Sequence, residues 1–203
     1  MDDIGESLGK NPERTALNAT TLSLHTDLVE ACKEGDRNAQ FRLYQLYSRA
    51  MYNICTRMLG DSAAAEDALQ EAFVSAFRKL HTFQGRSTFG AWLKRIVINK
   101  CVSTLQRRKI QYESLEYAEG NADTMVAPVL PEVSLPELQS GVIRDAIDEL
   151  PEGCRVIFSL YLLEGYDHQE IAGILGVSVS TSKSQYHRAK KLLQSKLVEY
   201  YPQ

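Results

Sequence analysis

The sequence lacks most of the features that identify enzymes, secreted proteins and membrane proteins. No apolar run approaches the roughly 20 residues that a membrane helix needs, and the acidic N-terminus has no apolar stretch typical of a secretory signal. The 203 residues contain no glycine-rich phosphate loop, no zinc-protease motif and no nucleophile elbow. We therefore expect a protein that is neither membrane-inserted nor an enzyme, and that needs no cofactor.

Cysteine and histidine are few and scattered. The four cysteines, Cys32, Cys55, Cys101 and Cys154, are 23, 46 and 53 residues apart, and the four histidines are equally dispersed. Neither a disulfide framework nor a zinc site has such spacing. The pattern favours buried free thiols in a reducing compartment, and hence a cytoplasmic protein that holds no metal.

The net charge of −3 conceals a strong asymmetry along the chain. Residues 78–109 carry nine Lys and Arg and no acid, residues 110–150 carry nine acids and one Arg, and residues 180–196 carry five bases and no acid. Two basic segments that flank an acidic one indicate a polyanionic partner more strongly than the net charge does. Solvated helix faces are the competing interpretation.

Apolar residues recur with helical spacing over most of the chain. In 61–80 the positions i, i+3 and i+4 are apolar, and Asp61 stands where a helix cap belongs. A helical pattern over 27–59 breaks near Gly35-Asp36, and another begins after Gly85-Arg86-Ser87. Beyond the middle of the chain, helical patterns are expected over 138–150, 152–164, 167–175 and 179–197.

Residues 110–136 have no sustained period and hold three of the six prolines together with most of the acids of the middle segment. We interpret them as a flexible acidic linker that spans roughly 30 Å on average. The sequence thus predicts an all-α protein of two small helical domains, at 25–109 and 137–203. Residues 1–24 are expected to be an N-terminal extension whose polar composition favours disorder.

Residues 167–190 have the spacing of a helix-turn-helix. Ala172 is a small residue where two helices approach, Gly176 ends the first helix, and Ser178 or Ser180 can cap the second. The second helix displays polar and basic side chains suited to the major groove of DNA. These are Thr181, Lys183, Ser184, Gln185, His187 and Arg188. A plain helical hairpin with a solvated outer face is the alternative.

Residues 81–95 interleave aromatic and basic side chains, as in proteins that bind single-stranded nucleic acid. Phe89 and Trp92 also lie on the apolar face of the expected helix, so we expect some of these aromatics to belong to the core. The preceding segment 66–73 alternates acidic and apolar residues. It fits either a protein-docking face or an ordinary amphipathic helix.

Three segments in order resemble the sigma-70 family, and specifically the extracytoplasmic-function (ECF) sigma factors. They are EDALQEAFVSAFRKLHTF, then STFGAWLKRIVINKCVSTLQRRK, then the helix-turn-helix that ends in TSKSQYHRAKKLL. The resemblance covers 25–109, which corresponds to region 2 of the family, and 138–198, which corresponds to region 4.

The resemblance implies an initiation factor for bacterial RNA polymerase, with the polymerase core, promoter DNA and an anti-sigma factor as partners. The residues that it implies for docking on the core are Asp67, Gln70, Glu71, Phe73 and Phe77. Those implied for melting and reading the −10 element are Phe83, Arg86, Ser87, Thr88, Trp92, Lys94, Arg95, Asn99 and Ser103. Those implied for the duplex −35 element are Ser180, Thr181, Lys183, Ser184 and Arg188.

This chain departs from the family pattern at Ser180, Ser182 and Gln185, which leaves the −35 sequence preference open. A helix-turn-helix regulator that binds operator DNA without polymerase is the alternative function. A metal-dependent nuclease that uses the four acids of 61–71 is disfavoured, because four acids spread over about three helical turns cannot all converge on one ion. Those acids are Asp61, Glu66, Asp67 and Glu71.

Overall fold

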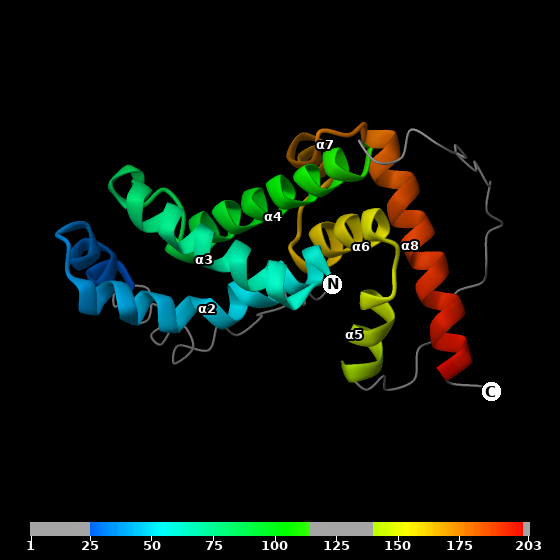
Figure 1. Ribbon diagram of the computed structural model, residues 1–203, viewed down its shortest axis with the longest axis horizontal. Coiled ribbons are helices and arrows are strands. Elements are labelled where there is room, and N and C mark those ends of the chain that lie inside the picture. The colour runs from blue at the N-terminus through cyan, green and yellow to red at the C-terminus, as the bar shows by residue number, and fades with distance from the viewer. Residues whose placement is uncertain (1–24, 114–139, 201–203) are drawn as a thin grey trace, which may run out of the picture.

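The described residues fold into helices, and within 25–113 and within 140–200 short turns join them (Figure 1). The computed structural model describes residues 25–113 and 140–200, so the expected extension at 1–24 and most of the expected linker lie outside the described residues. Within these ranges there is no strand, which confirms the all-α prediction, and no helix combines the length and the apolar character needed to cross a membrane. The elements are a helix at 25–33, α2 (Arg37–Leu59), α3 (Ser62–Lys79), the 3-10 turn η1 (Leu80–Thr82), α4 (Phe89–Glu113), α5 (Ser140–Asp148), α6 (Glu152–Phe158), the π-helical turn η2 (Ser159–Leu163), α7 (His168–Leu175) and α8 (Val179–Tyr200).

Aspartates fix the start of α2 and of α3. Asp61 Oδ1 accepts a hydrogen bond from Ala64 N at 2.7 Å, which confirms the predicted cap of α3. Asp36 Oδ1 accepts one from Asn38 N at 2.7 Å at the start of α2. Gly35 precedes it with a φ of 92°, a conformation that glycine adopts without steric cost. The predicted break near Gly35-Asp36 is therefore confirmed.

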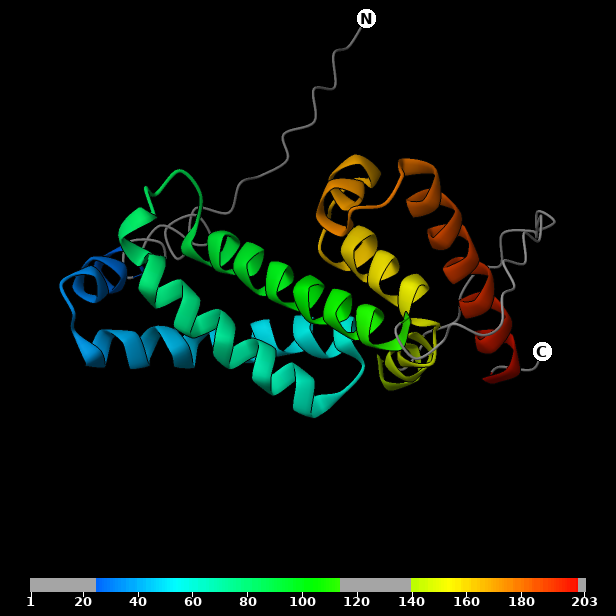
Figure 2. The same cartoon turned by 45° about the horizontal axis from the view of Figure 1, so that its top comes forward.

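Helices α2, α3 and α4 form a three-helix bundle, and the helix at 25–33 covers one end of it (Figure 2). The apolar stripes that the sequence indicates meet in the core of this bundle. Its buried side chains include Leu43, Met58, Ala65, Ala72, Leu93 and Val97. Helix α4 continues to Glu113, so residues 110–113, which the sequence assigns to the linker, are helical.

All four cysteines are buried and free, as the sequence predicts. Burial raises the pKa of Cys32 to about 11, and burial also raises the pKa of Cys154. The thiols of Cys55 in α2 and Cys101 in α4 are hydrogen-bonded to each other, and this bond together with burial raises the pKa of Cys101. These four side chains therefore act as small apolar residues of the core.

Helices α5 to α8 form a second, smaller unit. Pro151 separates α5 from α6 at the position where the sequence pattern is interrupted, and it occupies the cap position of α6, where its missing N–H is not needed. Helices α6 and α8 pack closely, while α7 and the start of α8 form the predicted helix-turn-helix. One buried apolar cluster lies within this unit and comprises Ala146, Ile147, Leu150, Cys154, Phe158, Ala189 and Leu193.

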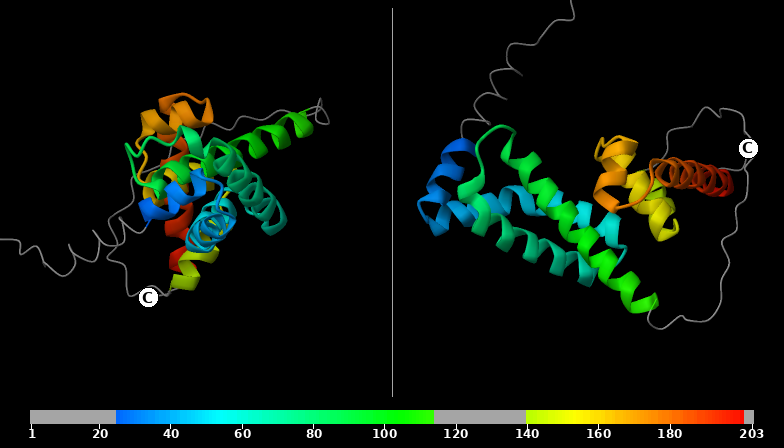
Figure 3. Two further views of the ribbon diagram at one scale, coloured as in Figure 1. Left: turned by 90° about the vertical axis from the view of Figure 1, so that its left-hand side faces the viewer. Right: turned by 90° about the horizontal axis from the view of Figure 1, so that it is seen from above.

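The two units pack directly against each other, which the sequence does not predict. Helix α6 contacts α2, and α7 contacts α4. Figures 2 and 3 show the second unit beside the first bundle. Val156, Ile157, Leu160 and Ile171 of the second unit are buried in the same apolar cluster as the first bundle. Helical periodicity reveals that these residues have a buried face, but it does not reveal which partner covers that face.

A buried arginine sits at the centre of this contact. The Arg155 side chain of α6 is only 8% exposed. Its Nε donates to the carbonyl oxygen of Arg57 at 3.1 Å, and its Nη1 donates to the carbonyl oxygens of Asp148 and Leu150, each at 3.2 Å. The guanidinium thus joins the end of α2 to the end of α5. It lies so close to Gly60 that a Cβ built there would stand 2.5 Å from Nη2.

This close approach predicts that Gly60→Ala destabilises the fold more than a matched glycine substitution does. Gly60 and Gly176 both end a helix in the left-handed region, with φ of 65° and 70°, but a Cβ at Gly176 would meet nothing within 4 Å. We expect Gly176→Ala to lower the free energy of unfolding by about 1–2 kcal/mol through backbone strain alone. Gly60→Ala should cost about 1–3 kcal/mol more, because Arg155 must move.

Urea denaturation of the two full-length variants measures this difference. Equal losses for Gly60→Ala and Gly176→Ala would contradict the packing of Arg155 against Gly60.

Candidate nucleic-acid interface

The loop at 83–88 leads directly into the start of α4. Thr88 caps the helix, since its Oγ1 accepts a hydrogen bond from Ala91 N at 3.2 Å. Gly85 has a φ of 69°, which allows the chain to reverse there. The side chains of Arg86, Ser87 and Thr88 are exposed, so all three predicted loop residues are free to meet a partner.

Three aromatic rings pack together at the base of this loop. The ring centroids of Phe83, Phe89 and Trp92 lie between 5.3 and 5.9 Å apart. Phe89 is buried, whereas Phe83 and Trp92 are half-buried. The expectation that some of these aromatics belong to the core is therefore confirmed for Phe89, and the other two present part of their rings to the surface.

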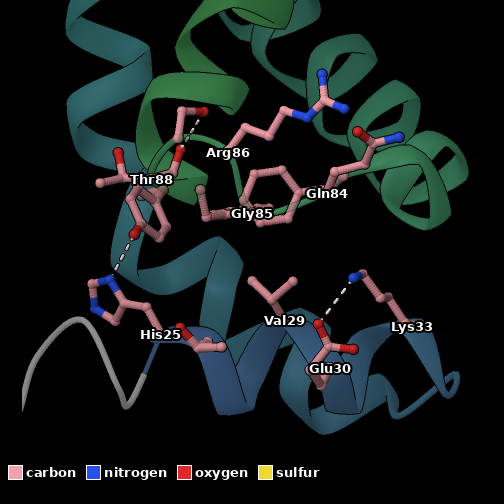
Figure 4. A pocket seen from close by; sticks show the side chains of 13 residues that line it. His25, Val29, Glu30, Lys33, Gln84, Gly85, Arg86 and Thr88 are labelled. Atoms are coloured by element: carbon pink, nitrogen blue, oxygen red, sulfur yellow. Dashed lines mark hydrogen bonds and ion pairs between the residues drawn. The ribbon is translucent and has the colours of Figure 1, made fainter.

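A cavity of about 480 Å³ lies between this loop and the helix at 25–33 (Figure 4). Val29, Glu30 and Lys33 form the side that the helix contributes, and Phe83 and the loop form the opposite side. At one end, His25 Nδ1 and the hydroxyl of Tyr47 are hydrogen-bonded at 2.7 Å. The sequence gives no motif for the helix at 25–33, so this wall of the cavity is not predicted.

The exposed face of α4 continues from the loop. Arg95, Asn99 and Ser103 are exposed and recur at helical spacing, so the structure brings these three predicted residues together on one face. Lys94 is different, because it is turned toward the second unit. Its Nζ donates to the Glu164 carbonyl oxygen at 3.2 Å and lies 3.4 Å from the Glu164 carboxylate.

The residues that the resemblance implies for polymerase docking divide into three groups. Asp67 and Gln70 are exposed on α3. Glu71 forms an ion pair with Lys100 of α4 at 2.6 Å, and this hydrogen bond holds the pKa of Glu71 below its usual value. Phe73 is only 3% exposed and Phe77 is half-buried, so these two side chains support the surface from within.

Helix α2 contributes to the same surface, which the sequence does not predict. A shallow cavity of about 420 Å³ lies between α2 and α3, lined by Tyr44, Arg49 and Gln70 among others. Tyr44 packs edge-to-face on Phe73, with ring centroids 4.8 Å apart. Several large apolar side chains nearby in sequence on these two helices are exposed: Phe41, Tyr44, Leu46 and Val74.

The helix-turn-helix has the geometry that the sequence indicates. Gly176 ends α7 in the left-handed conformation, and its N–H donates to the Ala172 carbonyl oxygen at 2.9 Å. Ser178, and not Ser180, caps α8, because its Oγ accepts a hydrogen bond from Thr181 N at 3.0 Å. All five predicted residues of α8 are exposed: Ser180, Thr181, Lys183, Ser184 and Arg188.

Two departures from the family pattern face inward. Ser182 is 0% exposed, and its Oγ is hydrogen-bonded to His168 Nδ1 at 2.9 Å. His168 in turn stacks on Tyr161, with ring centroids 4.5 Å apart. Gln185 is half-buried, and its Oε1 accepts a hydrogen bond from Cys154 Sγ at 3.0 Å. Both side chains therefore hold α8 in place.

Two of the four acids considered for a metal site have separate partners. Asp61 caps α3 and lies 3.8 Å from Arg108, while Glu71 pairs with Lys100. No group of three or more His, Cys, Asp or Glu in residues 25–113 and 140–200 is arranged to hold a metal ion. The geometry gives no support to a nuclease centre there.

Two family models match the chain. Sigma-70 region 2 matches residues 43–110, and Sigma-70, region 4 matches residues 140–193. The ECF RNA polymerase sigma factor SigW of Bacillus subtilis is 31% identical over 176 residues, which are 83% of this chain and 94% of the relative. The ECF RNA polymerase sigma-E factor of Escherichia coli is 32% identical over 178 residues, which are 84% of this chain and 92% of the relative.

The fold is also similar to that of a solved structure. The sigma factor RpoE from Bartonella quintana, in complex with the anti-sigma factor NepR, has a TM-score of 0.50 and 22% identity, over 77% of this chain and 94% of that one. The family models together match more than half of the chain, and the two relatives cover most of its length. The chain therefore belongs to the sigma-70 family and, within it, to the ECF RNA polymerase sigma factors.

Proposed function

We propose that this sigma factor binds the RNA polymerase core in the cytoplasm and directs initiation at specific promoters, with no catalytic activity of its own. The observation that carries the proposal is the cavity of about 480 Å³ between the loop at 83–88 and the helix at 25–33. Its wall includes an aromatic ring and its rim carries exposed basic side chains, which suits a base extruded from a melted strand. Extrusion costs a few kcal/mol, and such a pocket offsets that cost.

The −10 element is read by the loop at 83–88 and by α4. Phe83 and Trp92 offer ring faces for stacking, while Arg86 and Arg95 are placed to bind phosphates. Asn99 and Ser103, together with Ser87 and Thr88, supply hydrogen-bonding groups along the same path. Lys94 joins this set only when it is released from Glu164.

The polymerase core docks on the surface formed by α2 and α3. Asp67 and Gln70 face outward there, next to the exposed ring of Tyr44. The buried Phe73 holds Tyr44 in place, and the pair of Glu71 with Lys100 fixes α3 against α4. An exposed apolar surface bordered by charged groups is typical of a protein-binding site.

The −35 element is read as duplex by α8. Lys183 and Arg188 are placed for guanine edges or phosphates, and Ser180, Thr181 and Ser184 for base edges. Because Ser182 and Gln185 face inward, the outward residues alone determine the sequence preference. The domain that carries them extends over 137–203, and the domain that carries the −10 site extends from residue 25 to the end of α4 at Glu113.

One further partner and one further contact with polymerase belong to this proposal. An anti-sigma protein binds this chain and controls its access to polymerase, as NepR is bound to RpoE in the similar structure. The acidic linker, which begins after Glu113 and extends to residue 136, is repelled by DNA and lies in a basic channel of the polymerase.

Ser182 and Ser184 of α8 differ in burial, and this difference predicts opposite effects of their substitution on stability and on promoter affinity. Ser182→Ala removes a buried hydrogen bond to His168, so we expect it to lower the free energy of unfolding by about 1–2 kcal/mol. Its affinity for a promoter, as holoenzyme, should be unchanged. Ser184→Ala removes an exposed hydroxyl, so stability should change by less than about 0.5 kcal/mol, while promoter affinity should fall about threefold to tenfold.

Urea denaturation and a fluorescence binding assay on the holoenzyme measure the two effects. The assignment of faces on α8 fails if Ser182→Ala weakens promoter binding more than Ser184→Ala does.

Run-off transcription with core polymerase on genomic fragments tests the function itself. We expect the purified chain to yield discrete, promoter-specific transcripts, and we expect the chain alone to bind the same fragments poorly in a gel shift. A chain that yields no specific transcript but binds those fragments tightly without polymerase would be the alternative, a helix-turn-helix regulator.

A further inference from the structure

Two cations of region 2 converge on one carboxylate of region 4. Glu164, which follows η2, has a side chain only 8% exposed. Its carboxylate accepts a hydrogen bond from Arg57 Nη2 at 2.6 Å and lies 3.4 Å from Lys94 Nζ. Lys94 Nζ also lies 5.6 Å from the ring centroid of Tyr166. Arg57 comes from the end of α2 and Lys94 from α4, so the bundle itself places both cations.

The arrangement is that of an anion site on the surface of region 2. Without Glu164, two positive groups would stand within reach of the same small anion and would repel each other. Arg57 Nη2 donates its hydrogen bond to the carboxylate. Arg57 Nε, in contrast, is buried and has no hydrogen-bond partner among the described residues. A phosphate has more acceptor oxygens than a carboxylate, and arginine binds phosphate with two parallel hydrogen bonds.

The ion cluster is not needed to hold the two units together. A buried ion pair contributes little net stability, because desolvation offsets the Coulomb attraction. The apolar side chains of Ile157, Leu160 and Ile171 already bury a continuous interface with region 2. Arg155 adds three hydrogen bonds to carbonyl oxygens at that interface. The placement of Arg57 and Lys94 therefore calls for a different explanation.

We propose that Arg57 and Lys94 form a binding site for a phosphate of the melted promoter strand, and that Glu164 occupies this site while region 4 is packed on region 2. The proposal rests on the proposed function, since it takes promoter DNA as the ligand. Lys94 lies on the same helix as Arg95 and Asn99, so a strand on the exposed face of α4 passes close to this site. The carboxylate and the strand exclude each other, so the strand binds there only when Glu164 no longer neutralises the two cations.

Glu164→Gln tests this exclusion in the full-length chain without polymerase. The probe is a fluorescein-labelled single-stranded DNA of 20 nucleotides and mixed sequence. We expect Glu164→Gln to bind it about tenfold more tightly than the natural chain does. The matched control is Glu152→Gln, which makes the same charge change at an exposed position at the start of α6 and should leave the affinity within about twofold.

Arg57→Gln in the Glu164→Gln background tests the phosphate contact. The added substitution should abolish the gain in affinity. It should also lower the slope of log affinity against log salt by about 0.7, the value for one phosphate of a single strand. An affinity for Glu164→Gln equal to that of Glu152→Gln, or an unchanged slope on adding Arg57→Gln, overturns the proposal.

A second measurement does not depend on Glu164→Gln folding. With core polymerase present, Arg57→Gln alone should reduce run-off transcription at 0.15 M salt by about fivefold to tenfold, because the strand loses a phosphate contact. If Arg57 serves only to hold region 4 in place, its loss leaves transcription unchanged or raises it. Failure of the proposed function would appear differently, as the absence of a specific transcript from the natural chain.

Discussion

The packing of the Arg155 guanidinium between the two helical units is the interaction on which the rest of the structure depends. A charge this deeply buried is tolerated only when its hydrogen bonds are satisfied, and Arg155 donates to three carbonyl oxygens. These oxygens lie at the ends of α2 and α5, where the helix dipoles favour a cation. The same contact requires glycine at position 60 and brings Glu164 onto Arg57.

The contact between the two units leaves some of the predicted DNA-binding residues exposed and engages another. The loop at 83–88, the outer face of α4 and the outer face of α8 stay exposed, so these surfaces are free to meet DNA. Lys94, by contrast, is engaged by Glu164 of the other unit. Region 4 therefore leaves most of the region 2 surface open and covers one end of the path that a melted strand would take.

Helix positions, caps and the helix-turn-helix were predictable from the sequence, because they depend on local patterns. Asp61 and Gly176 show this, since a cap and a left-handed turn need only their immediate neighbours. Arg155 and Glu164 were not predictable as contacts, because their partners are far away in sequence and nothing distinguishes these residues from surface charges. The helix at 25–33 was missed as a wall of the cavity for the same reason. The sequence shows that Ser182 departs from the family pattern. The reason for the departure, which is the buried hydrogen bond to His168, is visible only in the structure.

The distance between the two regions in the free chain tests most directly whether Arg155 holds them together. Fluorophores introduced as unnatural amino acids at the exposed positions Gln45 in α2 and Gln194 in α8 report it by single-molecule energy transfer. The natural chain should give one narrow distribution of transfer efficiency, and Arg155→Gln should give a broad distribution shifted to lower efficiency. A broad, low-efficiency distribution in the natural chain would contradict the closed arrangement. A distribution that Arg155→Gln leaves unchanged would contradict the part assigned to Arg155.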